Sequence, residues 1–509
     1  MHNNTGKVYL IGAGPGDPDL ITVKGRKYIQ LADVIVYDYL ASPYLLNYAR
    51  EDAEVIYVGK KGRDHTLSQE NINALLVEKG RKGLTIARLK GGDPFIFGRG
   101  GEEVEELFKA GIPFEIIPGV TSAIAAPAYA GIPLTHRKYT SSVSIITGHE
   151  DPSRGESNLN WEIIAKDPGT LVFLMGVKNL DGIATQLVKH GKSSDTPAAL
   201  IHRGTTPMQK TITGTLDNIV KRIKNAGITS PSVIIVGDVI KNRDSMKWFE
   251  NRPLFGKKIV VTRARKQASE FVRQLSALGA ECLEYPTIKI VPPDDYMPLD
   301  SAIERVSGYD WIVFTSVNGV SAFFNRLYEK GMDVRELKGL KTAAIGPATS
   351  ERLMDFGILT DILPESYMAE SVVEAFKNEE IKSKKILLPR AGNARPILCD
   401  ELKKMGAIVD EITTYNTIEV RDNVDLLQEQ LEAGKVDMIT FTSSSTVRNF
   451  RSLLPGEKFE TFEKDVCIAA IGPITAETAE KNGFDVNIVA DTYTIKGLCE
   501  AILKYYTAC

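Results

Sequence analysis

The sequence predicts an α/β protein made of several domains. Six short apolar segments alternate with longer amphipathic stretches; the apolar segments are residues 8–11, 34–37, 85–88, 144–147, 170–175 and 232–236. Such runs are typical of buried strands, whereas residues 70–79 and 102–110 carry charge on one side, as surface helices do. Strands that alternate with helices favour largely parallel sheets. A chain of 509 residues has room for about two to four such domains.

Composition and charge are those of an ordinary globular protein. The hydrophobic fraction is 43% and the formal net charge is −3, so the chain as a whole does not attract nucleic acid or anionic membranes. No segment approaches the ~18 consecutive apolar residues of a membrane span. Residues 1–7 are polar and lack the basic and apolar regions of a signal peptide. We therefore expect a cytoplasmic protein that binds neither nucleic acid nor membrane.

Cysteines and histidines form no metal motif. The five cysteines contain no Cys-x-x-Cys pair, and their odd number favours reduced thiols; they are Cys282, Cys399, Cys467, Cys499 and Cys509. The six histidines lie within the first 202 residues, and no two have the i, i+4 spacing of a helical metal site. We predict no metal.

A linker is predicted at residues 243–256, between domains at 1–242 and 257–509. The segment is polar and charged, contains Pro253 and follows neither a helical nor a strand period. Trp248, Phe249 and Phe255 are unusual in a solvated linker, so we expect the segment to dock on one of the domains.

The second half of the chain contains an internal repeat. The segment at residues 258–263 recurs 127 residues later (385 minus 258), and the segment at 310–316 recurs at the same offset (437 minus 310). Residues 257–509 are therefore predicted to form two similar α/β units. Two similar lobes suit a ligand that is enclosed from both sides, although the repeat by itself names no reaction.

Three sequence blocks dominate the first half, at residues 11–18, 90–102 and 117–137, and the first two are glycine-rich turns. In the first, Gly12, Gly14 and Gly16 are evenly spaced. The dinucleotide fingerprint needs G-x-G-x-x-G instead, which argues against a nicotinamide-dependent oxidoreductase. Asp93, in the second turn, is suited either to hold the amino group of a zwitterionic ligand or to start a turn before Pro94.

The third block contains a predicted helix. Thr121 or Ser122 is suited to cap this helix. The alanines that follow would let another segment pack close to it.

In this order, the three blocks resemble the uroporphyrinogen-III C-methyltransferase family of tetrapyrrole methyltransferases, over about residues 6–242. Segments 37–40, 58–61, 174–176 and 203–205 match further family blocks. The resemblance implies a two-lobed methyltransferase fold, S-adenosylmethionine as cofactor and a homodimer formed through this domain. It implies a cofactor site lined by Pro15, Gly91, Gly92, Asp93, Ile96, Thr121, Ser122, Met175 and Gly204.

The same resemblance implies Asp38 as proton acceptor and Lys60 as proton donor. An acid–base pair suits the chemistry, because a pyrrole carbon is a weak nucleophile until the macrocycle loses a proton. The rest of catalysis would be alignment of the methyl group with the carbon. Without the resemblance, the alternatives are that Asp38 is a surface turn residue and that Lys60 is a solvated charge beside Lys61.

The repeat resembles uroporphyrinogen-III synthase over about residues 257–507, through segments 261–263, 314–319, 415–417 and 441–446. This resemblance implies one lobe at 257–290 with 417–509 and another at 293–413. It implies closure of hydroxymethylbilane to uroporphyrinogen III, with inversion of the last pyrrole ring and without a cofactor.

A substrate with many carboxylates needs many hydrogen-bond donors and cations in its site. Hydroxyls at strand ends suit carboxylates, and the candidates are Thr315, Ser316, Thr442 and Ser443. Arg263 and Arg390 would add charge-assisted bonds; the alternative is that the hydroxyls only cap helices. Tyr415 matches the family's cleft tyrosine, which makes it the candidate general acid, although a half-buried core tyrosine is the alternative.

The expected protein is thus a bifunctional enzyme that makes uroporphyrinogen III and methylates it twice, to precorrin-2. One alternative is that only the methyltransferase is active and that the C-terminal half merely binds tetrapyrrole. Another is a methyltransferase for a later corrin intermediate, against which the fused synthase argues. The end pathway, sirohaem or cobalamin, is left open.

Overall fold

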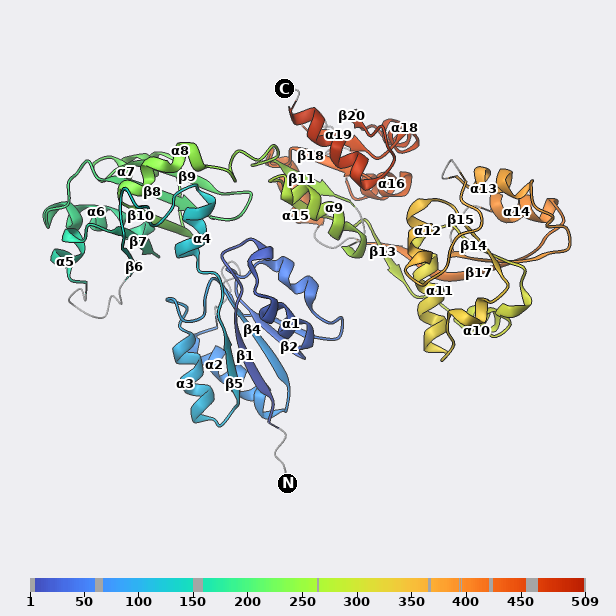
Figure 1. Ribbon diagram of the computed structural model, residues 1–509, viewed down its shortest axis with the longest axis horizontal. Helices are drawn as coiled ribbons and strands as arrows, with labels where there is room; N and C mark the ends of the chain where they lie inside the picture. Colours follow the sequence, from blue (N-terminus) through green and yellow to red (C-terminus); the bar gives the residue numbers. More distant parts are fainter. Residues whose placement is uncertain are drawn as a thin grey trace. The chain divides into compact units, whose positions relative to one another are not determined.

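The computed structural model describes residues 5–59, 67–149, 159–262, 265–364, 368–392, 394, 396–420, 424–454 and 466–507. Four five-stranded sheets with surrounding helices confirm the predicted α/β class (Figure 1). The contacts divide the chain into two compact units. The first comprises Met1–Ile259, Arg273–Cys282 and Leu503–Cys509, and the second comprises Val260–Val272 and Leu283–Ile502.

The first sheet is entirely parallel. It has the order β3-β2-β4-β1-β5 and consists of β1 (Lys7–Gly12), β2 (Val34–Tyr37), β3 (Glu54–Tyr57), β4 (Thr85–Lys90) and β5 (Phe114–Ile117). Alternate residues of its strands enter two cores, one with α1 (Val23–Leu31), the other with α2 (Gln69–Arg81) and α3 (Gly100–Lys109). Because both faces are covered, β1 and β2 are almost continuously apolar. Their carboxyl ends meet at one edge, where ligands of such sheets bind.

The second sheet differs from the expected parallel arrangement. Its order is β6-β7-β10-β8-β9, and only β6 (Val143–Thr147) and β7 (Thr170–Leu174) pair in parallel. The strands β8 (Pro197–His202), β9 (Lys210–Thr215) and β10 (Ser232–Val236) join antiparallel ladders. The segment between β8 and β9 is short enough for a hairpin, whereas parallel neighbours need a crossover of a dozen residues or more. Apolar runs predict strands but not their direction.

Helices also cover both faces of the second sheet. On one face lies α4 (Ser122–Tyr129), whose alanines pack into the core. On the other face lie α5 (Trp161–Lys166), α6 (Leu180–Lys189) and α7 (Ile219–Asn225). Since α4 begins directly after the first sheet, it brings the two sheets of this unit together.

The segment predicted as a linker docks on the first unit, as its aromatic residues led us to expect. After the short helix α8 (Arg243–Met246), Trp248 Nε1 donates a hydrogen bond to the Ala128 carbonyl at 3.1 Å. The ring of Phe249 lies 4.7 Å from that of Tyr129, centroid to centroid, and Phe249 is only 3% exposed.

We expect Phe249→Ala to lower the free energy of unfolding of the first unit by about 3–5 kcal/mol, because it leaves a cavity beneath the docked segment. Denaturant unfolding of the full chain measures this. The matched control is Phe108→Ala, since Phe108 is 77% exposed and its loss should change stability by no more than about 0.5 kcal/mol. Equal effects of the two substitutions would contradict the docking.

The second half contains the two remaining sheets. One, with the order β12-β11-β18-β19-β20, consists of β11 (Lys258–Val261), β12 (Glu281–Glu284), β18 (Met438–Phe441), β19 (Cys467–Ala470) and β20 (Val486–Val489). The other, with the order β13-β17-β16-β14-β15, consists of β13 (Ile288–Val291), β14 (Trp311–Phe314), β15 (Lys341–Ala344), β16 (Lys385–Ala391) and β17 (Ile408–Glu419). Around them lie α9 (Arg265–Ala277), α10 (Met297–Glu304), α11 (Val317–Glu329), α12 (Pro347–Met354), α13 (Ala369–Phe376), α14 (Ile397–Lys404), α15 (Val424–Glu432), α16 (Ser444–Ser452), α18 (Pro473–Lys481) and α19 (Ile495–Thr507).

The structure confirms the internal repeat. The strand β14 leads into α11 through the N-cap Ser316, and β18 leads into α16 through the N-cap Ser443. In both copies a helix beginning Gly-Pro follows the next strand, at α12 and α18. The long strand β17 pairs first with β16 in parallel and then with β13 in antiparallel fashion.

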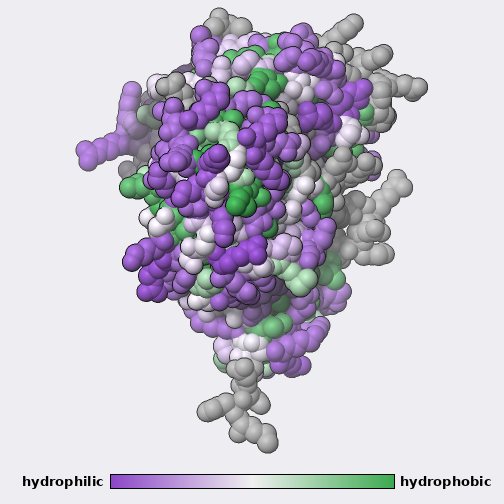
Figure 2. Space-filling view, turned by 90° about the vertical axis from the view of Figure 1, so that its right-hand side faces the viewer, coloured by the Kyte–Doolittle hydropathy of each residue, from purple (hydrophilic) through white to green (hydrophobic). Residues whose placement is uncertain are grey.

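No helix in the described part of the chain is long and apolar enough to cross a membrane. The face in Figure 2 is mainly hydrophilic, and hydrophobic residues form only scattered patches on it.

Candidate active sites

Three glycine loops meet at the carboxyl edge of the first sheet. They follow β4, β1 and β5, which are neighbours in the sheet. Gly92 donates its amide hydrogen to the Gly14 carbonyl at 2.7 Å, and Gly14 returns a longer bond of 3.3 Å. A Cβ on Gly12 would lie closer than 3.0 Å to Gly119, and a Cβ on Gly119 would meet the Gly92 carbonyl equally closely. Only residues without a side chain allow this packing.

Asp93 ties two of these loops together. Its Oδ1 accepts the Phe95 amide at 2.8 Å and its Oδ2 accepts the Gly119 amide at 2.9 Å. The turn that the sequence offered as an alternative is therefore present, and contact with a ligand's amino group stays a prediction. Thr121 caps α4, as expected, by accepting the Ala123 amide at 3.3 Å. A Cβ on Gly92 would lie 3.7 Å from the Thr121 Cα, so all three motifs converge here.

The turn after β8 lies against the first of these loops. Thr205 Oγ1 accepts the Asp17 amide at 3.1 Å. A Cβ on Gly204 would lie closer than 3.0 Å to Ala126 of α4. The turn at Gly204 is thus the segment that packs closely on the alanines of α4. Through Thr205 it also contacts the first glycine loop, where other predicted cofactor residues lie. Met175, which follows β7, is 49% exposed, and no hydrogen bond of the described residues joins it to the glycine loops.

Backbone strain gathers around the same edge. Six non-glycine residues of the described chain have positive φ. Phe97 and Arg99 lie in the loop after β4, Arg203 and Thr205 lie in the turn after β8 that contacts the first glycine loop, and Met175 and Ser383 lie elsewhere. Residues in this conformation cost free energy and cluster at functional sites. Near them Phe95 and Ile96 expose apolar side chains. The edge therefore offers both close backbone approach and apolar surface.

Asp38 lies beside the loop that follows β4. Its neighbour Leu40 packs on Gly91, where a Cβ would come closer than 3.0 Å. The Asp38 side chain is 24% exposed. Its Oδ1 accepts the Leu40 amide at 3.1 Å, and its Oδ2 lies 3.4 Å from both terminal nitrogens of Arg88. Lys60, the other predicted catalytic residue, lies outside the described residues.

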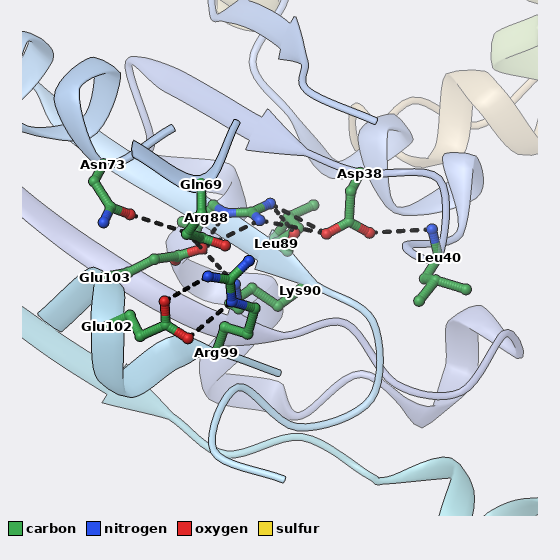
Figure 3. A network of polar contacts seen from close by, with 10 residues as sticks. All are labelled: Asp38, Leu40, Gln69, Asn73, Arg88, Leu89, Lys90, Arg99, Glu102 and Glu103. Atoms are coloured by element: carbon green, nitrogen blue, oxygen red, sulfur yellow. Dashed lines mark hydrogen bonds and ion pairs between the residues drawn. The ribbon is translucent and has the colours of Figure 1, made fainter. Parts of the chain in front are cut away.

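Behind Asp38 is a buried charged network that the sequence analysis missed (Figure 3). Arg88 and Lys90 project from β4 toward Glu103 of α3, and all three are at most 4% exposed. Arg88 lies 3.3 Å from Glu103 Oε1, and Lys90 bonds the same oxygen. Burial lowers the pKa of the Lys90 ammonium, and the nearby Arg88 adds to this effect. The available signal was two cations at i and i+2 in an apolar strand, which share one face.

In the second half, Tyr415 lies at the end of β17 and is 7% exposed. Its hydroxyl lies 3.0 Å from Ser316 Oγ, which also accepts the Gly319 amide at 3.0 Å as the cap of α11. Arg390, at the end of the adjacent strand β16, is buried and pairs with Glu411 at 3.0 Å. The structure thus brings Tyr415 together with Ser316, next to Thr315.

Ser443 occupies the equivalent place on the other sheet of this half. It follows Thr442 and caps α16 by accepting the Thr446 amide at 3.3 Å. Both Ser316 and Ser443 therefore cap helices, which was the alternative interpretation of the sequence. That their hydroxyls also bind substrate carboxylates stays a prediction. Arg263 lies outside the described residues.

Comparisons with known proteins assign a family to each half. Residues 7–220 match the family of tetrapyrrole (corrin/porphyrin) methylases, and residues 269–500 match uroporphyrinogen-III synthase HemD. A relative from Ruminiclostridium josui, named porphyrin biosynthesis protein HemD, is 38% identical over 98% of both chains. The chain therefore belongs to the family of porphyrin-biosynthesis proteins in which a methylase domain is fused to a uroporphyrinogen-III synthase domain.

Two further relatives each match about half of this chain. The uroporphyrinogen-III C-methyltransferase of Priestia megaterium is 57% identical over 46% of this chain and 98% of its own length. The S-adenosyl-L-methionine-dependent uroporphyrinogen III methyltransferase of Methanosarcina barkeri is 53% identical over 48% of this chain and 96% of its own length.

Proposed function

We propose that this chain is a bifunctional enzyme that closes hydroxymethylbilane to uroporphyrinogen III and then methylates the product twice, giving precorrin-2. The observation that carries the proposal is the meeting of three glycine loops beside Asp38. The name of the Priestia megaterium relative supports uroporphyrinogen III as the substrate that is methylated, and the resemblance to the synthase family supports hydroxymethylbilane. We also propose a cytoplasmic homodimer joined through the methyltransferase domain, with the domains at 1–242 and 257–509.

The glycine edge fits S-adenosylmethionine, which the Methanosarcina barkeri relative uses. The backbone of Gly91 and Gly92, together with Pro15, would hold the polar part of the cofactor. The half-exposed Ile96 and Met175 would cover its adenosine, and Thr121 and Ser122 would supply the start of α4. Bound S-adenosylmethionine supplies an electrophilic methyl group. Asp38 then accepts the proton that the macrocycle loses, and Lys60 acts as proton donor.

In the synthase half, Tyr415 is the proposed acid. Its hydroxyl proton goes to the hydroxymethyl oxygen of the substrate, the carbon–oxygen bond breaks and water leaves. Ser316, 3.0 Å away, holds the tyrosine in place, while Thr315, Thr442, Ser443, Arg263 and Arg390 bind substrate carboxylates. Because the intermediate also closes spontaneously without inversion, the main contribution of the site is conformational restraint.

We expect Tyr415→Phe to slow formation of the type III isomer by about tenfold, below the usual range for general acids because restraint remains. Methylation of supplied uroporphyrinogen III should not change. The matched control is Tyr328→Phe, because Tyr328 is an exposed tyrosine of α11 in the same unit. An unchanged rate and isomer ratio in Tyr415→Phe would remove this residue from the mechanism.

One experiment tests both activities together. Pure full-length protein receives hydroxymethylbilane and S-adenosylmethionine, and the oxidised products are resolved by mass and isomer. Doubly methylated type III product is expected. Unmethylated type III product would contradict the methyltransferase assignment, and type I product alone would leave the C-terminal half as a binding domain without ring inversion.

A further inference from the structure

Glu103 is a buried carboxylate that the proposed chemistry does not use. It lies on α3 and is 0% exposed. Arg88, Lys90 and Gln69 all donate to its Oε1, the last at 3.1 Å. Its Oε2 is buried and has no hydrogen-bond partner in the part of the chain that the structure describes. Because burial of a carboxylate is costly even when it is paired, its place behind the proposed base points to a role in the site.

Arg88 lies between the carboxylates of Asp38 and Glu103 and forms a short ion pair with neither (Figure 3). Its terminal nitrogens lie 3.4 Å from Asp38 Oδ2, and two of its nitrogens lie 3.3 and 3.4 Å from Glu103 Oε1. Charge-assisted bonds of this kind are ordinarily about 2.7–2.9 Å long. The shortest bond of Arg88, at 2.9 Å, goes to the neutral Leu89 carbonyl. The guanidinium is therefore shared.

We propose that Glu103 is a positioning residue of the methyltransferase site, which holds Arg88 back from Asp38 and so leaves the Asp38 carboxylate available to the tetrapyrrole. The inference rests on Asp38 being the base. Arginine side chains stay protonated in proteins, so the network acts through charge and position and does not relay a proton. Lys90 balances the charge of Glu103, which makes the set of four side chains neutral.

The surroundings of Asp38 leave Arg88 as its main electrostatic partner. Arg88 and Lys90 face it from β4, Tyr57 from β3 and Tyr39 from its own loop. Of the charged groups that the structure describes, only Arg88 forms an ion pair with Asp38. A change in the contacts of Arg88 should therefore alter the ion pair with Asp38 first.

The test is Glu103→Gln in the full chain, assayed as kcat and as the pH dependence of kcat/KM for uroporphyrinogen III. Without the competing carboxylate, Arg88 closes on Asp38 and favours its charged form. We expect kcat to fall about tenfold and the acid limb to move about one pH unit lower. The KM for S-adenosylmethionine should not change. The matched control is Glu106→Gln, a carboxylate of the same helix whose side chain is 45% exposed and pairs with Lys109.

A second variant removes the effect of an unpaired buried charge. Lys90→Met combined with Glu103→Gln deletes one cation and one anion, so the buried net charge is unchanged, and a thermal melt verifies folding. The same lowered acid limb is expected. An acid limb at the wild-type pH in both variants would overturn the inference, because a purely structural role lowers activity equally at every pH.

Asp38→Asn in the same assay separates the two proposals. If Asp38→Asn keeps the wild-type rate, Asp38 is not the base and the inference falls with it. If Asp38→Asn slows methylation while Glu103→Gln leaves the acid limb of the kcat/KM profile at the wild-type pH, Asp38 remains the proposed base. Only the role of Glu103 is then refuted.

Discussion

Replacing Asp38 by asparagine in the full chain should slow methylation of uroporphyrinogen III by about 10²- to 10⁴-fold, the usual contribution of a general base. Asparagine keeps the shape of the side chain and its bond to the Leu40 amide, so the loop beside Gly91 should stay in place. The affinity for S-adenosylmethionine should therefore be unchanged. Single-turnover methyl transfer and calorimetric titration of the cofactor measure the two quantities separately.

Two controls belong to this experiment. Asp52→Asn changes an exposed aspartate of the same domain that pairs only with Arg50 among the described residues, and it should leave methylation unchanged. The synthase activity of the Asp38→Asn protein reports whether the rest of the chain is intact. Wild-type turnover in Asp38→Asn would remove Asp38 from the mechanism. Loss of cofactor affinity together with turnover would make it a binding residue instead.

The strands of the first sheet were predictable because both of their faces are buried. Residues 8–11 and 34–37 are continuous apolar runs, and the structure places strands at Lys7–Gly12 and Val34–Tyr37. The direction of pairing in the second sheet was not predictable. The segments at 170–175 and 232–236 look alike as sequences, yet β7 and β10 are antiparallel neighbours, because pairing direction depends on long-range chain path.

The glycine loops were predictable from the sequence because each is a local feature with one physical reason, the absence of a side chain. Their mutual contacts, such as Gly14 with Gly92, arise only when the sheet brings the strand ends together. The charged network escaped prediction for the opposite reason. Arg88 and Lys90 are ordinary surface residues by type, and only the central place of β4 in the sheet buries them. Glu103 becomes their partner through the packing of α3.

The repeat shows a similar division between local and long-range information. Ser316 and Ser443 follow strands and precede amphipathic helices, so their capping role was readable from the sequence. The bond between Ser316 and Tyr415 joins residues that are far apart in the chain, and no local pattern contains it. This bond holds the hydroxyl of Tyr415 in a fixed position.

Replacing Gly119 by alanine should weaken the binding of S-adenosylmethionine by about 100-fold or more. The new Cβ would lie closer than 3.0 Å to backbone atoms of Gly92 and Gly12. Backbone atoms cannot move aside as a flexible side chain does, so the loops after β1, β4 and β5 must separate. This factor corresponds to a loss of about 2.8 kcal/mol of binding free energy. Calorimetric titration of the full-length protein with the cofactor measures the loss.

Gly101→Ala is the matched control for this loss. Gly101 lies in the first turn of α3, close in sequence to the same loops, but a Cβ there meets nothing within 4 Å. Alanine also favours a helix over glycine by up to about 1 kcal/mol, so this variant should bind the cofactor normally and be slightly more stable. If Gly119→Ala bound S-adenosylmethionine as tightly as Gly101→Ala, the close packing of the three loops would not be what forms the cofactor site. If Gly119→Ala instead lost synthase activity as well, the damage would extend beyond the methyltransferase domain and the test would fail to support a local role for Gly119.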